Sequence, residues 1–280
     1  MSVITISRGS FSRGKEVAEA LASELDYECI SREILVEASD RFQIPELTLG
    51  RALHDAPSLL ERFNHGQEQL IGYFKSAFLT HMAKDNVVYH GLAGHFFLQN
   101  ISHVLKVRII ANQDDRIREE MQREGCSQAT ARERISRDDE ARRRWGQQLF
   151  AQDSWDSRLY DMVLSVDSLG VDDIVELLLR SVKKNQFAPT PESVAALQQR
   201  LVLAHVQALL TPMAPNARVQ LEEDRRISIS NLAGPLRSDL GVRRELAHTL
   251  KDLCSLEEVR FREPIRPERD HINTFFNLEL

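Results

Sequence analysis

The sequence has few cysteines, no long apolar run and no leader-like start. Its three cysteines, Cys29, Cys126 and Cys254, lie far apart, and no two of them form a Cys-x-x-Cys pair. This spacing predicts neither a disulfide framework nor a zinc site, as is usual in a reducing compartment. No apolar run approaches the ~18 residues of a membrane span, and residues 1–15 lack the features of a signal peptide. We therefore expect a cytoplasmic protein without a membrane span.

The chain also lacks an excess of basic charge. Its net charge is -6, which argues against a general nucleic-acid binder, because such proteins are normally basic. With 42% hydrophobic and 28% charged residues, the composition is that of a globular protein. A length of 280 residues leaves room for one large domain or two unequal ones.

The first part of the chain alternates short apolar runs with helical patterns. We expect strands at 3–7, 27–30, 87–89, 104–111 and 162–166, and helical segments at 59–82, 113–150 and 171–182. This order predicts an α/β fold, a doubly wound parallel sheet with crossover helices, as one domain over residues 1–184.

The rest of the chain shows a different order of expected helices and strands. Residues 185–192 are polar and contain prolines, so they read as a linker. After them, helix 191–210, strands 217–222 and 226–231, helix 237–253 and strand 257–262 predict a small α+β domain over residues 193–263. Residues 264–280, with prolines followed by an Asn/Phe-rich end, read as a tail.

A phosphate-binding signal follows the first expected strand. The motif fits Gly-x4-Gly-Lys of the P-loop, with glutamate where serine or threonine is usual. It comprises Gly9, Ser10, Phe11, Ser12, Arg13, Gly14, Lys15 and Glu16. Glycines let backbone amides turn around a phosphate, the following helix adds positive potential, and Lys15 can reach the outer phosphates. The alternative is a glycine-rich turn with a helix-starting glutamate.

Arginine replaces lysine completely over residues 107–182. Guanidinium groups pair with phosphate oxygens in a bidentate manner, so this bias favours an anion-closing helical lid. Arg134, Arg137 and Asp138 are spaced to share a helix face, and Asp139 with Arg142 and Arg143 continues it one turn later. The alternative is a solvated helix held by arginine–carboxylate pairs.

These motifs resemble the cytidylate-kinase-like branch of the P-loop kinases. The resemblance covers about residues 1–183, and its segments occur in the family's order. They are Ile4–Arg8 with the loop through Glu16, Ser31–Leu35, Asn86–Gly91, Arg137–Arg142, Trp155–Asp156, Tyr160–Leu164 and Leu169–Gly170. The family's loop carries glutamate at the position of Glu16. Two positions depart from its pattern: Ser31 replaces an aspartate, and Leu92 follows Gly91 where an arginine is expected.

The resemblance implies an ATP-dependent, Mg²⁺-requiring phosphotransferase acting on a nucleoside monophosphate or similar small acceptor. It implies that the loop binds ATP and that Lys15, Arg137 and Arg142 stabilise the transferred phosphoryl group. Arg32, Gly91, Asp139 and Arg143 are then expected on the acceptor side. Because of the two departures, a second hypothesis stays open: a nucleotide-binding sensor that signals through its C-terminal domain.

The C-terminal domain resembles a BON-type domain in its element order and in the segment Ile227–Gly234. It offers no catalytic constellation, so it reads as a ligand-binding, sensing or dimerisation module with a protein partner or a second copy. His81, His90, His95 and His103 lie near one another in sequence. We expect structural roles for them rather than a metal site, because no converging carboxylate or cysteine ligands can be assigned.

Overall fold

The computed structural model describes residues 2–54, 66–223 and 225–262. They belong to two compact units, Met1–Ala208 and Leu209–Leu280, which are considered separately. The expected start of a helix at 59–65 and the expected tail at 264–280 lie outside the described residues. In the part of the chain that is described, none of the helices combines the length and apolar character needed to cross a membrane.

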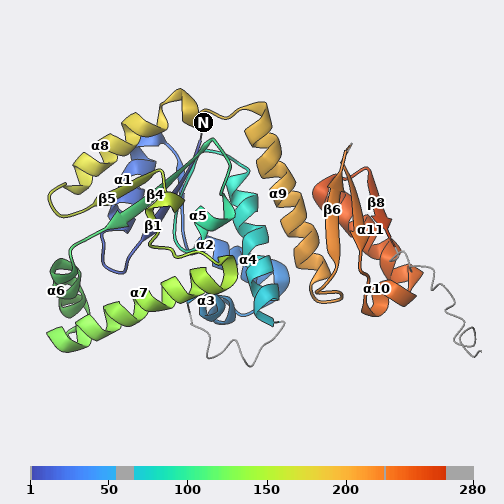
Figure 1. Cartoon of the computed structure of the whole chain (residues 1–280), viewed down its shortest axis with the longest axis horizontal. Coiled ribbons are helices and arrows are strands. Elements are labelled where there is room, and N and C mark those ends of the chain that lie inside the picture. The colour runs from blue at the N-terminus through green and yellow to red at the C-terminus, as the bar shows by residue number, and fades with distance from the viewer. Residues whose placement is uncertain (1, 55–65, 224, 263–280) are drawn as a thin grey trace, which may run out of the picture. The chain divides into compact units, whose positions relative to one another are not determined.

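The first unit contains a five-stranded sheet in the order β2-β3-β1-β4-β5, and every neighbouring pair is parallel (Figure 1). The strands are β1 (Val3–Arg8), β2 (Glu28–Ile30), β3 (Val87–His90), β4 (Val104–Ile110) and β5 (Met162–Ser165). All five expected strands are present, and each differs from its expected range by one residue at one end. The prediction of a doubly wound parallel sheet is confirmed.

Helices cover both faces of this sheet. Residues of α1 (Gly14–Leu25) and α8 (Val171–Val182) share one buried cluster with Ile4 and Ile6 of β1. Val3 points to the opposite cluster, because side chains alternate along a strand. That second cluster includes residues of α2 (Glu33–Phe42), α3 (Glu46–His54), α4 (Gly66–Met82) and α5 (Gly94–Phe97).

Two helices form a helical hairpin beside the sheet: α6 (Gln113–Glu124) and α7 (Gln128–Phe150). They occupy the charged segment in which the sequence predicted a lid (Figure 1). Gly125 ends α6 in the left-handed conformation, and the side chain of Ser127 caps α7 by accepting a hydrogen bond from the amide of Thr130. The short helices η2 (Ser157–Leu159) and η3 (Asn185–Phe187) complete the elements of the first unit apart from α9.

Helix α9 (Pro191–Leu210) lies largely within the first unit, so the division between units falls after the expected linker. Leu197 and Ala204 join the core. Polar contacts add to this packing: the Nδ1 atoms of His205 and His103 lie 2.7 Å and 2.8 Å from the hydroxyls of Ser76 and Ser193. The sequence pattern predicted the limits of α9 but grouped the helix with the C-terminal domain, because the unit against which a helix packs depends on contacts distant in sequence.

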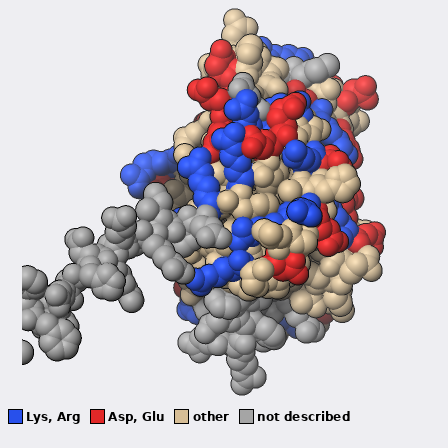
Figure 2. Space-filling view, turned by 90° about the vertical axis from the view of Figure 1, so that its right-hand side faces the viewer, with Lys and Arg blue, Asp and Glu red and all other residues tan. Residues whose placement is uncertain are grey.

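The second unit contains a three-stranded sheet in the order β6-β7-β8. Its strands are β6 (Arg218–Glu222), β7 (Arg226–Ser230) and β8 (Glu258–Phe261), and its helices are α10 (Gly234–Ser238) and α11 (Leu240–Cys254). The central strand β7 pairs with β6 in the antiparallel sense and with β8 in the parallel sense. On the face shown in Figure 2, Lys and Arg side chains are mixed with Asp and Glu.

Candidate active site

The loop between β1 and α1 follows the central strand of the sheet. Phe11 and Arg13 both adopt the left-handed conformation, with φ values of 56° and 55°. Gly14 is required for close packing, since a Cβ atom there would lie 2.8 Å from Cβ of Arg8. The loop therefore turns sharply and delivers the chain into the first turn of α1, where helical amides have no intrahelical acceptor.

The backbone amides of this loop are available for a ligand. No residue in the described part of the chain accepts a hydrogen bond from the amides of Ser10 to Arg13. The Ser12 hydroxyl instead donates to the carbonyl of Gly9 at 3.0 Å, which tightens the turn. Open amides at the start of a helix form an anion-binding site.

The charged residues at the start of α1 pair with one another at the surface. The Arg13 guanidinium lies 2.6 Å from the Glu16 carboxylate, and the Lys15 ammonium lies 3.5 Å from Glu19. The side chain of Lys15 is 62% exposed. Lys15 therefore lies beside the loop, with its ammonium on the surface of α1.

A cavity of about 470 Å³ opens next to the loop. Of the residues predicted from sequence, Gly9, Arg32, Gly91, Asp139 and Arg142 line it. Lys15, Arg137 and Arg143 are not among its lining residues. The cavity lies where the carboxyl ends of β1, β3 and β4 meet, the usual position for ligands in an open α/β sheet.

Three arginines in this cavity lack a carboxylate partner. Arg8, Arg108 and Arg142 line the cavity, and no described carboxylate forms an ion pair with any of them. By contrast, Arg32 pairs with Glu46 at 2.7 Å. Burial lowers the pKa of both Arg8 and Arg142, but a guanidinium remains charged at neutral pH. The cavity is therefore suited to an anion.

Arg108 is held by a buried polar network that the sequence did not indicate. Its guanidinium donates to the carbonyl of Ser154 at 2.6 Å and to the Tyr160 hydroxyl at 3.3 Å. That hydroxyl lies 3.2 Å from Oγ of Ser7 and 3.2 Å from Nε2 of His95. Burial lowers the pKa of His95 to about 3, so its imidazole is neutral at pH 7. The one signal in the sequence was an arginine inside a buried strand.

Aromatic side chains form part of the cavity wall. They are Phe74, Tyr89, Phe96, Trp145 and Trp155. Trp155 is 51% exposed, and the Arg143 guanidinium lies 4.7 Å from the centre of its ring. Arg143 also forms a bidentate ion pair with Asp153, from Nε to Oδ1 at 3.2 Å and from a terminal nitrogen to Oδ2 at 2.7 Å. Arg143 thus supports the cavity wall from behind Trp155, and it does not line the cavity itself.

The turn after β3 also lines the cavity. The Tyr89 hydroxyl donates to the Leu92 carbonyl at 2.8 Å, and a Cβ atom on Gly94 would lie 2.8 Å from the Tyr89 ring. Ala93 takes the left-handed conformation at the centre of the turn, with φ 67°. Leu92 lines the cavity with an apolar side chain, so this turn supplies no cation.

Carboxylates near the loop differ in their availability for a metal ion. Asp139 is paired with Arg116 at 2.8 Å, and Glu16 is paired with Arg13. Asp138 is exposed, and among the described residues it accepts one long hydrogen bond, from the Ser10 hydroxyl at 3.4 Å. Among the described residues, no group of three or more His, Cys, Asp or Glu could hold a metal ion. Mg²⁺ bound with a nucleotide needs only one or two protein carboxylates, and Asp138 fits that requirement.

The phosphate-loop geometry and the 2-3-1-4-5 parallel sheet define a P-loop kinase-type α/β protein. Residues 3–168 match the model of the Cytidylate kinase-like family, and the chain belongs to that family. No curated protein matches the chain.

Several solved structures are similar to the chain. An uncharacterized protein from Eubacterium ventriosum shares 19% identity at a TM-score of 0.50, over 66% of this chain and 100% of that one. This likeness concerns the fold alone. A shikimate kinase from Bacteroides thetaiotaomicron shares 15% identity at a TM-score of 0.41, over 65% of this chain and 99% of its own. TT1252 from Thermus thermophilus shares 17% identity at a TM-score of 0.43, over 65% of this chain and 95% of its own.

Proposed function

We propose that the first unit transfers a phosphoryl group from ATP to a small anionic acceptor, a nucleoside monophosphate or a close analogue. The observation that carries the proposal is the cavity beside the phosphate loop with three arginines that have no carboxylate partner. A partly buried guanidinium that has no carboxylate within ion-pair distance gains from a nearby anion, and Asp138 and Asp139 act on Arg142 only at longer range. An acceptor phosphate in this cavity would supply that anion.

The donor phosphates bind the amides of the loop in this proposal, and the acceptor phosphate binds in the cavity. Arg142 lines the cavity and donates to the carbonyl of Arg8 at 3.2 Å, directly before the loop. It is therefore close to both phosphates and stabilises the charge that develops between them. Phosphoryl transfer needs little covalent chemistry from the protein, so positioning and charge neutralisation supply the rate.

Two further groups act on the donor. Mg²⁺, when bound with ATP, neutralises charge on the outer phosphates, and Asp138 is the carboxylate that would hold it. Lys15 contributes after its ammonium leaves Glu19, from which it is separated by 3.5 Å in a weak, exposed pair. Arg137 lies on the exposed part of α7, so we assign it a secondary role at the donor.

The aromatic side chains of the cavity suit an acceptor that carries a planar ring. Rings stack on aromatic faces, and the cavity volume of about 470 Å³ is within the ~300–1,000 Å³ range of small-molecule sites. Arg32 lines the same cavity, and its pair with Glu46 offers a donor and an acceptor to polar groups on a ring or a ribose.

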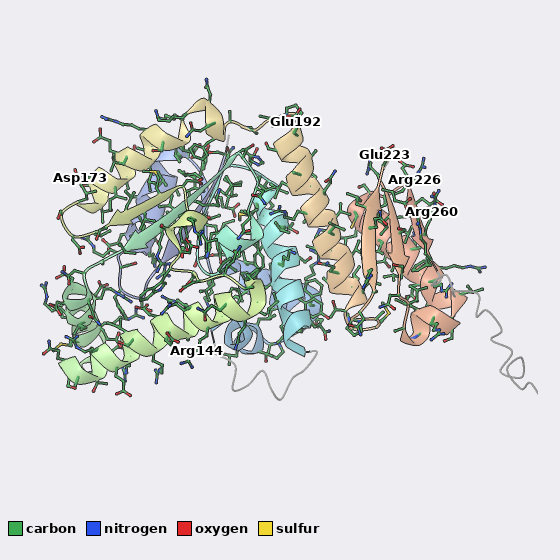
Figure 3. The ribbon with its side chains drawn as sticks, viewed as in Figure 1. Arg144, Asp173, Glu192, Glu223, Arg226 and Arg260 are labelled. Carbon is green, nitrogen blue, oxygen red and sulfur yellow. The ribbon has the colours of Figure 1, made fainter. Side chains whose placement is uncertain are left out.

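The test is ADP release with Mg²⁺-ATP and a panel of nucleoside monophosphates. We expect acceptor-dependent turnover, lost by about 10²–10³-fold in Arg142→Ala, as for removal of one charge-stabilising donor. The matched control is Arg144→Ala, two positions later on the same helix; Arg144 pairs with Glu140 at 2.9 Å on the outer side of α7 (Figure 3). Tight ATP binding without turnover on any acceptor would contradict the proposal and favour a nucleotide sensor.

A further inference from the structure

The phosphate loop carries a large aromatic residue at its centre. The side chain of Phe11 leaves the loop and packs against a small hydrophobic cluster inside the α6–α7 hairpin, formed by Ile117, Ala131 and Ile135. The Arg123 guanidinium lies 5.7 Å from the centre of the Phe11 ring. An apolar contact thus joins the middle of the loop to both helices of the hairpin.

A polar contact joins the same two parts one residue earlier. Arg116 of α6 donates from Nε to the carbonyl of Ser10 at 2.7 Å. Its two terminal nitrogens donate to Asp139 of α7 at 2.8 and 2.9 Å. Both side chains are largely buried, with 12% and 16% exposure. Arg116 therefore links the loop, α6 and α7 through three hydrogen bonds.

The conformation of the loop explains why such contacts are needed. Phe11 and Arg13 adopt left-handed backbone angles, which are unfavourable for residues with a Cβ atom. A loop with these residues needs external contacts to hold its shape, and Phe11 and Arg116 provide them. The hairpin in turn carries Arg142, which lies one turn after Asp139 and lines the cavity.

We propose that Phe11 and Arg116 are positioning residues that couple the phosphate loop to the α6–α7 hairpin. Donor phosphates that order the loop then also fix Arg142 over the cavity. The acceptor binds more tightly when ATP is present, and ATP binds more tightly when the acceptor is present, by the same factor. This inference rests on the proposed function, because it assigns the donor to the loop and the acceptor to the cavity.

The experiment measures the affinity for each nucleoside monophosphate of the panel, with and without a non-hydrolysable ATP analogue, for the full chain and its variants. In the unaltered protein we expect the analogue to raise acceptor affinity about 5-fold or more. Phe11→Ala should reduce this factor to about 1, while Phe11→Leu, which keeps an apolar side chain, should retain most of it. Arg116→Ala should act like Phe11→Ala. Arg118→Ala is the matched control, since Arg118 is an exposed residue of α6 that pairs with Asp115.

Thermal unfolding of each variant shows whether it is folded, and hydrogen exchange supplies an independent readout. In the ligand-free protein, Phe11→Ala should speed amide exchange over residues 128–150 relative to Arg118→Ala. A folded Phe11→Ala protein with unchanged coupling and unchanged exchange would overturn the inference. If the unaltered protein binds no ATP analogue, the proposed function fails, and the exchange experiment still decides whether Phe11 holds the hairpin to the loop.

Discussion

The two units differ in their content of buried side-chain nitrogen and oxygen atoms that have no hydrogen-bond partner. In the first unit, Thr5, Arg8, His90 and His95 each bury a side-chain nitrogen or oxygen that has no hydrogen-bond partner. Among the described residues, none of the atoms in this class lies beyond Ala208.

In the second unit, charges pair with one another at the surface. Arg260 pairs with Glu222 at 3.4 Å and with Glu258 at 2.6 Å. Figure 3 places Arg260 near Arg226 on that unit. Burying a polar atom without a partner is costly, so a fold retains one where a ligand or a catalytic step compensates. Two of these residues, Arg8 and His95, line the cavity of the first unit, where a ligand would supply the missing partner.

Acid unfolding should give the largest difference between the units. Burial lowers the pKa of His90 and His205 to about 4 and that of His95 to about 3, and all three belong to the first unit. The unfolded chain takes up these protons near pH 6.5, so stability is full above that pH and falls as the pH drops towards 4. Each histidine contributes about 1.4 kcal/mol per pH unit in this window.

Urea unfolding between pH 7 and pH 4.5 measures this loss. His95→Phe should make the dependence on pH weaker, since it removes one of these groups and leaves the others in place. If the free energy of unfolding were the same at pH 7 and pH 4.5, these histidines would not be held neutral by burial.

Arg108→Ala should give the next largest effect. The substitution removes a cavity cation and leaves the Tyr160 hydroxyl and the Ser154 carbonyl without one of their partners. We expect kcat/KM to fall by about 10²–10³-fold. Arg108→Lys keeps the charge but not the paired geometry and should recover only part of the loss. Equal activity of all three proteins would place the acceptor elsewhere.

Trp155→Ala separates the contribution of the aromatic side chains of the cavity from that of its arginines. It removes a stacking surface and leaves the three unpaired arginines in place. We expect KM for the acceptor to rise by about 10-fold with little change in kcat, since stacking on an aromatic ring contributes on the order of 1–1.5 kcal/mol. Trp155→Phe should restore most of the affinity. A change confined to kcat would show that the ring acts on the reacting groups.

Arg260→Ala tests the second unit and should have the smallest effect. Exposed ion pairs contribute little, so turnover and the midpoint of thermal unfolding should stay within experimental error of the unaltered protein. A loss of activity comparable to that of Arg108→Ala would show that the second unit takes part in the reaction.

The sequence predicted the elements better than the site. Local patterns are enough to find β1, the loop and α1, because strand alternation, glycine spacing and helix periodicity act over a few residues. The resemblance to kinases also selected Gly9, Arg32, Gly91, Asp139 and Arg142, which line one cavity.

Other parts of the site depend on packing between distant segments. Arg108 and Tyr160 meet because β4 pairs with β5, and Trp155 is positioned by Arg143 from another element. The role of Arg143 behind the wall and the surface position of Lys15 follow from side-chain directions, which spacing along the sequence does not fix.

The central claim is that the open amides between Ser10 and Lys15 bind the phosphates of ATP. The most direct measurement is a titration of the ¹⁵N-labelled protein with Mg²⁺-ATP, followed through its amide resonances. The account predicts that the resonances of Ser10 to Lys15 shift first and most strongly. Saturable binding that moves other amides and leaves these six unchanged would contradict it.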